Sequence, residues 1–153
     1  MKKQLTLVFL IKDNRVLLAM KKRGFGAGRW NGLGGKVGAD ESVEDAMKRE
    51  ASEEAGVTPI DYKKSARILF NEFDNGEKVQ HHVDVYLCSK WLSEPHETEE
   101  MAPKWFGLDD LPLEDMWDDD KYWLKRVLAG EKLSCEFELD SDDRVVSQKI
   151  ETF

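Results

Sequence analysis

Seven of the 11 glycines in this chain fall within the eighteen residues from 21 to 38, directly before a segment with helical periodicity. Glycine adopts backbone conformations that other residues avoid, and it lets two backbones approach closely. This density therefore predicts an irregular loop packed against another element. Ser42 is a suitable N-cap for the segment that follows, and Gly56 is a suitable C-terminal stop. The sequence predicts a glycine-rich loop that leads into a capped helix.

The rest of the chain reads as strands with one further helix. Apolar or alternating runs bounded by turn residues predict the strands. These runs cover residues 4–11, 15–20, 66–73, 79–91 and 104–108, and a C-terminal hairpin covers 133–139 and 144–152. The polar, acidic composition of residues 92–103 predicts a loop. A second helix is expected from Asp118 to Leu128. Strands mixed with helices predict an α/β fold in which helices cover a mixed sheet, and the length suits one domain over residues 1–153.

The charge balance excludes several classes of partner. The chain has 23 basic and 31 acidic residues, for a formal net charge of −8. Proteins that bind a nucleic-acid polymer or an anionic membrane need clustered Lys and Arg. The longest early apolar run, residues 5–11, is too short to span a membrane, and Cys88 and Cys135 make no disulfide framework. We therefore expect a soluble, cytoplasmic protein without a targeting segment, whose partner is a small molecule.

The first predicted helix carries carboxylates on the face that should be apolar. At about 100° per residue, Glu50 and Glu54 fall on the same face as Val43 and Met47, and Glu53 lies beside them. Carboxylates three or four residues apart repel each other unless a cation lies between them, and burying them unpaired is costly. Mg²⁺ suits oxygen ligands and a phosphorylated substrate. The alternative reading of the same pattern is a solvated acidic face.

Glycine, glutamate and arginine recur here at a fixed spacing. Gly35 is followed after five residues by Glu41, and after seven more by the segment 49–57, which reads REASEEAGV. This pattern resembles the Nudix box, Gly-x5-Glu-x7-Arg-Glu-U-x-Glu-Glu-x-Gly-U, in which U is a bulky aliphatic residue. Ala51 is smaller than the usual residue at its U position. The resemblance implies the Nudix α/β/α sandwich with a mixed sheet, and an enzyme that hydrolyses a nucleoside diphosphate linked to a further group.

The resemblance also implies a role for each position of the box. Arg49 would orient the glutamates through charge-assisted hydrogen bonds. Water activated by Mg²⁺, or by Mn²⁺ as a substitute, would attack a phosphorus and release nucleoside monophosphate and pyrophosphate. Glu53 and Glu100 are rival candidates for the general base. The metal ligands implied are the backbone carbonyl of Gly34 and the side chains of Glu50, Glu53, Glu54 and Glu100.

Segments 20–32, 99–106 and 115–123 extend the resemblance to animal members of the family that hydrolyse oxidised purine nucleoside triphosphates, such as 8-oxo-dGTP and 2-hydroxy-dATP, and so clean the nucleotide pool. Trp117 and Phe25 would stack on the purine. Asp119 and Asp120 would read its Watson–Crick edge, and a shared proton would widen the range of bases accepted. The substrate-binding residues implied are Thr6, Lys21, Phe25, Asn31, Leu33, Gly34, Gly35, Lys36, Phe70, Met101, Trp117, Asp118, Asp119 and Asp120.

Several alternatives stay open at the level of sequence. Asp118, Asp119 and Asp120 also suit the N-terminus of the following helix without any substrate. Leu33 and Asp118 stand where the animal enzymes have an aromatic residue and a proline, and His81 falls where those enzymes have a methionine that lines the pocket. The substrate could therefore be a dinucleoside polyphosphate, a nucleotide sugar or an RNA cap instead. A non-catalytic ligand sensor of the same fold is disfavoured because all four box glutamates are intact. We expect a monomer.

Overall fold

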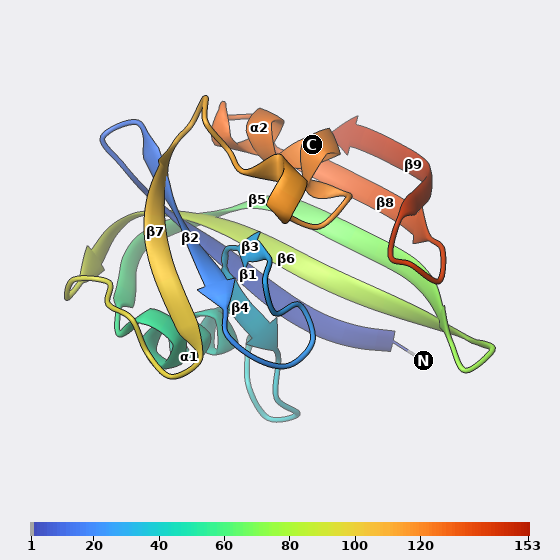
Figure 1. Ribbon diagram of the computed structural model, residues 1–153, viewed down its shortest axis with the longest axis horizontal. Helices are drawn as coiled ribbons and strands as arrows, with labels where there is room; N and C mark the ends of the chain where they lie inside the picture. The colour runs from blue at the N-terminus through green and yellow to red at the C-terminus, as the bar shows by residue number, and fades with distance from the viewer. Residues whose placement is uncertain (1) are drawn as a thin grey trace.

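The structure, a computed structural model, describes residues 2–153 apart from the side chain of Asp74. Within this range it contains nine β-strands, two α-helices and one short 3-10 helix (Figure 1). In chain order the elements are β1 (Lys2–Lys12), β2 (Arg15–Lys21), β3 (Trp30–Asn31), β4 (Leu33–Lys36), α1 (Val43–Ala55), β5 (Thr58–Asp74), β6 (Glu77–Leu92), β7 (Met101–Gly107), η1 (Leu113–Asp115), α2 (Asp120–Leu128), β8 (Leu133–Leu139) and β9 (Val145–Thr152).

The nine strands form one mixed sheet. Its main path is β3-β2-β1-β6-β5-β8-β9, while β4 pairs with β1 and β7 pairs with β2. β1 runs parallel to β6, and β5 runs parallel to β8. The other pairs are antiparallel, including the predicted C-terminal hairpin of β8 and β9. In Figure 1, α1 and α2 lie on opposite sides of this sheet.

The central strand β1 is covered on both of its faces. Phe9 belongs to a cluster of buried side chains that includes Trp123 of α2. Val8 and Leu10 belong to a second cluster, which includes Met47 of α1. Successive side chains of a strand point to opposite faces, so these two clusters lie on opposite sides of the sheet. The layers are therefore helix, sheet and helix, which confirms the predicted α/β/α sandwich.

Both predicted ends of α1 are confirmed. The Ser42 side chain accepts a hydrogen bond from the Asp45 backbone amide at 3.0 Å. Gly56 adopts a left-handed conformation with φ of 72°, and its amide donates to the carbonyls of Ala51 and Ser52. A side chain other than glycine would be strained there, so local sequence alone stops the helix.

The glycine-rich segment is more regular than its composition suggests. It contains β3 and β4, where we expected only an irregular loop. β4 pairs with residues 5–8 of β1, in a register that places Leu33 opposite Val8. β5 and β6 are also longer than predicted, and β7 begins at Met101 instead of residue 104. The backbone hydrogen bonds that form or extend these strands are made with strands distant in sequence, such as residues 5–8 for β4 and β2 for β7. Local patterns cannot reveal such partners.

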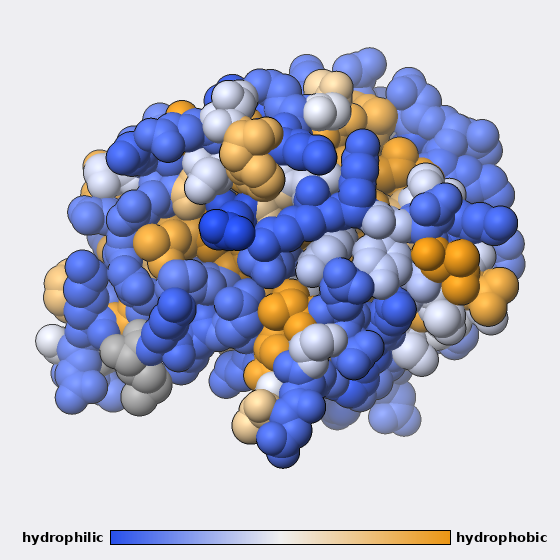
Figure 2. Space-filling model, turned by 180° about the vertical axis from the view of Figure 1, so that it is seen from behind, coloured by the Kyte–Doolittle hydropathy of each residue, from blue (hydrophilic) through white to orange (hydrophobic). Residues whose placement is uncertain are grey.

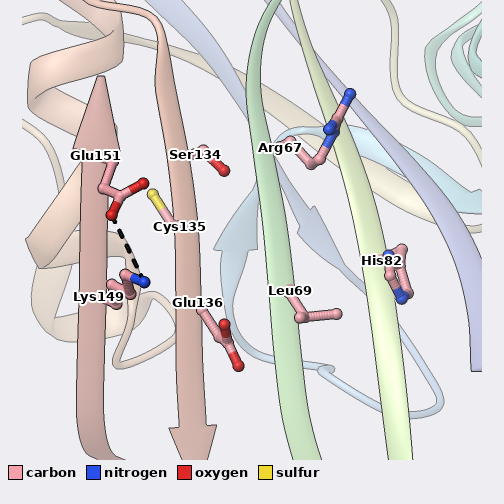
Figure 3. Close-up of a pocket in the computed structure, with 8 residues that line it drawn as sticks. All are labelled: Arg67, Leu69, His82, Ser134, Cys135, Glu136, Lys149 and Glu151. Carbon is pink, nitrogen blue, oxygen red and sulfur yellow. Dashed lines mark ion pairs between the residues drawn. The ribbon is translucent and has the colours of Figure 1, made fainter. Parts of the chain in front are cut away.

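One face of β5, β8 and β9 is open. It lies opposite α2 and bears a shallow depression of about 180 Å³ (Figure 3). Its lining residues are Arg67, Leu69, His82, Ser134, Cys135, Glu136, Lys149 and Glu151. From behind, the surface is mainly hydrophilic, with separate apolar patches (Figure 2). In the part of the chain that the structure describes, no helix is long and apolar enough to cross a membrane.

Gly34→Ala should destabilise the fold. A Cβ at this position would lie 2.0 Å from the Thr6 carbonyl oxygen and 2.9 Å from Leu7 Cα, and these backbone atoms cannot move without opening the β1–β4 pairing. We expect the free energy of unfolding, measured by urea denaturation, to fall by about 2–4 kcal/mol. Gly107→Ala in β7 is the matched control, because an added Cβ there meets nothing closer than 3.9 Å. Equal losses in the two variants would contradict the steric argument.

Candidate active site

Glu54, in the last turn of α1, is a buried carboxylate. Only 5% of the residue is exposed, and its Oε1 accepts a hydrogen bond from the Gly34 amide at 2.8 Å. The Thr98 hydroxyl donates to the backbone carbonyl of Glu54 at 3.0 Å. This bond fastens the segment before β7 to the end of α1. The helix, β4 and the segment that carries Glu100 therefore meet at one place.

The electrostatics of this place are strongly unfavourable without a cation. Burial raises the pKa of Glu54 to about 8, and the negative charges of Glu50 and Glu100 add to the effect. Burial also raises the pKa of Glu50, which Arg49 partly offsets. The charge of Glu100 disfavours ionisation of both Glu50 and Glu54, and Glu50 does the same to Glu54, so the three lie within electrostatic reach of one another. The negative charge is concentrated here, as the helical pattern predicted.

Arg49 connects the glycine-rich loop to the helix. Its guanidinium donates twice to Glu41, at 2.8 and 2.9 Å, and once to Glu50 at 2.9 Å. A longer bond reaches Glu53 at 3.3 Å, and another reaches the carbonyl of Lys36 at 3.1 Å. The bond from Arg49 and one from the Gly38 amide lower the pKa of Glu41 to about 2. Glu41 belongs to the box motif but was not among the predicted site residues; its role here is to hold Arg49.

Gly35 is required by close packing against Glu50. A Cβ added to Gly35 would lie 2.6 Å from Glu50 Oε1. Glycine thus lets the loop pass directly over the carboxylate, as its place in the motif implies. Lys36, by contrast, has an exposed side chain and takes part through its backbone carbonyl.

The donor atoms suit a hard divalent cation, although no ligand cage is preformed. Among residues 2–153, no three His, Cys, Asp or Glu side chains converge on a metal-sized site. The Glu54 carboxylate nevertheless lies buried beside two other carboxylates, with one neutral amide as its hydrogen-bond donor. Such a group is neutralised either by a proton or by a cation, and an all-oxygen set is the set that Mg²⁺ prefers. A hollow of about 250 Å³ lies alongside, lined by Lys21, Arg23 and Glu100.

A second acidic site lies just before and at the start of α2. Asp119 is 6% exposed and Asp120 3% exposed. Trp123 Nε1 donates to Asp119 Oδ2 at 2.8 Å. Burial raises the pKa of Asp119 to about 6, and burial together with the Asp119 charge raises the pKa of Asp120 well above its usual value. Asp120 Oδ2 is buried and has no hydrogen-bond partner within residues 2–153.

The structure shows no capping hydrogen bond from Asp119, although Asp120 does lie in the first turn of α2, as the helix-terminus interpretation expected. Asp119 itself occupies the N-cap position of the helix. Asp118 instead accepts from the Val145 amide at 2.9 Å and from Lys121 at 3.0 Å. Asp118 therefore ties the start of α2 to β9, whereas its two neighbours are left as a buried pair. Nothing in the sequence distinguishes the three.

Trp117 is held by the glycine-rich loop. The Arg29 guanidinium carbon lies 4.3 Å from the centre of the indole ring, and the Phe25 ring centroid lies 5.1 Å away. A Cβ on Gly26 would come within 3.2 Å of the same indole. Phe25 itself is 74% exposed. The loop therefore touches Trp117, while Lys21, the β2 residue that precedes the loop, slightly lowers the pKa of Glu54 through its positive charge without an ion pair. Arg29 was not predicted as a site residue.

The sheet divides the remaining predicted pocket residues between its two faces. Phe70 lies on the α2 side, stacked 5.8 Å from Phe137. Leu33 and Met101 are buried in the cluster on the α1 side. Thr6 shares the face of Val8 by strand alternation, and its hydroxyl is buried without a partner among the described residues. The structure therefore brings some predicted pocket residues beside Trp117 and places others near α1.

Asn31 lies next to the glycine-rich loop, on β3. Its Oδ1 accepts a hydrogen bond from the Gly32 amide at 2.9 Å. Its amide nitrogen makes no hydrogen bond with any residue from 2 to 153. Asn31 thus keeps a donor for a ligand, at the point where the loop joins the sheet.

Comparisons with known proteins agree with this geometry. A model of the NUDIX domain matches residues 1–127. The oxidized purine nucleoside triphosphate hydrolase of Mus musculus is 41% identical over 145 residues, which cover 95% of this chain and 92% of the mouse protein. Its counterpart from Danio rerio is 40% identical over 97% of this chain and 94% of its own length. A MutT protein from Bacillus halodurans has the same fold, with a TM-score of 0.82 at 24% identity over 97% of each chain. The box motif on α1, the sandwich around it and these matches together show that the chain belongs to the Nudix hydrolase family.

Proposed function

We propose that this protein hydrolyses oxidised purine nucleoside triphosphates to nucleoside monophosphate and pyrophosphate, with Mg²⁺ as its cofactor. The observation that carries the proposal is the Glu54 carboxylate, buried at the end of α1 beside Glu50 and Glu100. A structural carboxylate in that position would be paired with a basic side chain. Glu54 has the Gly34 amide instead, an arrangement suited to a bound cation.

The residues of α1 and the glycine-rich loop would hold the triphosphate end of the substrate. A bound divalent cation would lower the pKa of the attacking water and neutralise charge on the leaving phosphates. Gly34, Glu50, Glu53, Glu54 and Glu100 are its proposed ligands. Arg49 keeps Glu50 and Glu53 in place. Lys21 and Arg23, which line the adjacent hollow, would attract phosphate oxygens. Glu53 and Glu100 stay rival candidates for the general base.

The base would bind on the other side of the loop, between Trp117 and the start of α2. Trp117 offers an aromatic face for stacking. Asp119 and Asp120 can hold one proton between them, because burial disfavours a second negative charge. The protonated member donates and the ionised member accepts. Such a pair suits purines whose Watson–Crick edges differ, including 8-oxo-guanine and 2-hydroxy-adenine.

Other Nudix substrates and a sensor role have less support. The mouse and zebrafish relatives are both described as oxidized purine nucleoside triphosphate hydrolases, and each match covers more than nine-tenths of both proteins. A dinucleoside polyphosphate, a nucleotide sugar or an RNA cap would not need a buried acid pair. A sensor would not need the Arg49 network or a buried Glu54. We further propose a monomeric, cytoplasmic protein in which one domain over 1–153 performs the reaction; the two cysteines are unpaired, which suits a reducing compartment.

Glu54→Gln should keep the fold and lose most turnover. The substitution preserves size and the acceptor for the Gly34 amide but removes one ligand charge. We expect kcat/KM with 8-oxo-dGTP and Mg²⁺ to fall by about a hundredfold or more, and Mg²⁺ should raise the unfolding temperature less than it does in the wild type. Glu44→Gln, in the first turn of the same helix, is the control. Normal turnover in a folded Glu54→Gln variant would exclude the metal role.

Hydrolysis of 8-oxo-dGTP should yield 8-oxo-dGMP and pyrophosphate as the first products. The box motif and the Nudix relatives support cleavage between the α and β phosphates. Ion-exchange chromatography of early time points, without added pyrophosphatase, measures both products. Chelation of the metal with EDTA should stop their formation. Inorganic phosphate and a nucleoside diphosphate as primary products would refute the assignment.

Asp119→Asn and Asp120→Asn should each lower kcat/KM for 8-oxo-dGTP by at least about tenfold, which is ~1.4 kcal/mol. An amide cannot exchange a proton with the neighbouring carboxyl group. In the wild type, recognition needs one proton on the pair, so kcat/KM should fall below pH 6, where Asp119 becomes protonated. Asp119→Asn should remove this acid limb. If kcat/KM of Asp119→Asn still falls below pH 6 as in the wild type, or if the ratio of kcat/KM for 8-oxo-dGTP to that for dGTP is unchanged, the pair does not read the base.

Stability measurements separate this effect from misfolding. The folded-state pKa of Asp119 lies above its unfolded value, so the protein loses stability as pH rises to about 6 and Asp119 ionises. Burial raises the pKa of Asp120 well above its usual value, so ionising it as well would cost further stability. Asp120→Asn removes this buried ionisable group. Its unfolding temperature at pH 8 should therefore equal or exceed that of the wild type, while its activity is lower.

A further inference from the structure

Beyond the cluster that α2 covers, the sheet continues as a partly exposed floor on the side of the acid pair. Along β6, Val85 is fully buried, Val83 is partly buried, and His81 continues the same row. Along β5, Ile68 is buried, Phe70 is partly buried, and Glu72 continues the row. No register shift interrupts the pairing of these two strands between Ala66 and Asp74, so both rows stay on one face. Val79, the next residue of the β6 row, is 5% exposed. His81 and Glu72 thus lie outside the cluster that α2 covers, on a partly covered surface.

The start of α2 faces this floor. Tyr122, in its first turn, contacts Phe137 at 6.1 Å between ring centroids. Phe137 lies beside Phe70 in the β5–β8 register and stacks on it. Phe70 in turn lies directly opposite His81. Asp119 and Asp120 are therefore at the end of α2 that overlooks Phe70, and His81 lies one strand further along the same surface.

His81 and Glu72 form a hydrogen-bonded pair at the rim of the floor. His81 Nδ1 lies 2.8 Å from Glu72 Oε1, and the two side chains are 25% and 22% exposed. A carboxylate on Nδ1 fixes the proton there, so the other ring nitrogen, Nε2, becomes an acceptor in the neutral imidazole. Nε2 has no hydrogen-bond partner among the described residues, and the ring is still partly accessible. The pair therefore presents one oriented acceptor on an otherwise apolar surface.

Oxidation of guanine at C8 changes the group that such an acceptor would meet. Guanine has a lone pair on N7, whereas 8-oxo-guanine carries a hydrogen on N7. A purine whose Watson–Crick edge meets Asp119 and Asp120 turns its N7–C8 edge away from α2. An acceptor at that edge attracts the oxidised base and repels the ordinary one. A site built on such a hydrogen bond discriminates strongly, because the wrong base leaves polar groups unpaired.

We propose that His81 is a specificity-determining residue that accepts a hydrogen bond from N7–H of 8-oxo-guanine, and that Glu72 is the positioning residue that orients it. This inference rests on the proposed function and adds to it a second reading of the base. His81 would select only bases that are altered at the N7–C8 edge of the purine. 2-Hydroxy-adenine is altered at C2, and its N7 is an acceptor as in adenine. His81 therefore discriminates 8-oxo-dGTP from dGTP but not 2-hydroxy-dATP from dATP.

The test is the selectivity of His81→Met. We expect the ratio of kcat/KM for 8-oxo-dGTP to that for dGTP to fall about tenfold, whereas the ratio for 2-hydroxy-dATP and dATP stays unchanged. His82→Met is the matched control, because His82 lies on the opposite face, in the depression with Arg67 and Leu69 (Figure 3). His81→Gln keeps a side-chain acceptor and should retain part of the selectivity. Glu72→Leu should shift the same ratio in the same direction as His81→Met.

Two further measurements make every outcome decisive. Thermal unfolding of each variant shows that it is folded, and His81→Gln serves in place of His81→Met if the latter is not. Tryptophan fluorescence measures the affinity for 8-oxo-dGMP without turnover. Weaker binding in the His81 variant than in the His82 variant supports the inference. Equal binding and equal selectivity in the two variants overturn it. Wild-type protein that binds 8-oxo-dGMP but does not hydrolyse 8-oxo-dGTP refutes the proposed function alone, and wild-type protein that does neither refutes both.

Discussion

The parallel pairing of β1 with β6 is the constraint on which the rest of the molecule depends. The pairs run without a shift from Lys2 opposite Gln80 to Leu10 opposite Cys88. A parallel pair in the middle of a sheet must be covered on both faces. That requirement brings α1 to one face and α2 to the other. The glutamate site and the aspartate site are consequently on opposite sides of one sheet.

Both sites retain carboxylates that burial disfavours. Glu54, Asp119 and Asp120 are each less than a tenth exposed, and burial raises the pKa of each one. In a purely structural role such groups would be selected against, because apolar residues of the same size would stabilise the fold. The unfavourable charge is offset by rigid surroundings, including the Arg49–Glu41 pair and the Trp123–Asp119 bond. Instability confined to functional positions is the pattern expected of an active site.

Local signals in the sequence predicted the elements well and their partners poorly. The Ser42 cap and the Gly56 stop depend on neighbouring residues, and both are confirmed. β4 depends on residues about thirty positions earlier, so a glycine-rich segment concealed a strand. The carboxylates of α1 were predictable because helical spacing places them together. The pocket residues were harder, because strand alternation in a twisted sheet decides whether a residue such as Thr6 or Leu33 faces α1 or α2.

Three adjacent aspartates show why an acidic run cannot be assigned from composition. Asp118 bonds the backbone of β9, Asp119 accepts from Trp123, and Asp120 keeps a buried oxygen without a partner within residues 2–153. The side-chain direction changes at each residue as the chain turns into α2, so consecutive acids meet a strand, an indole and, at one Asp120 oxygen, no hydrogen-bond partner within residues 2–153. Along a strand, successive side chains point to opposite faces of the sheet. His81 therefore lies beside Phe70, whereas His82 lies on the open face. Backbone direction at each single residue, set by packing around β1, therefore decides which acid or imidazole a substrate can reach.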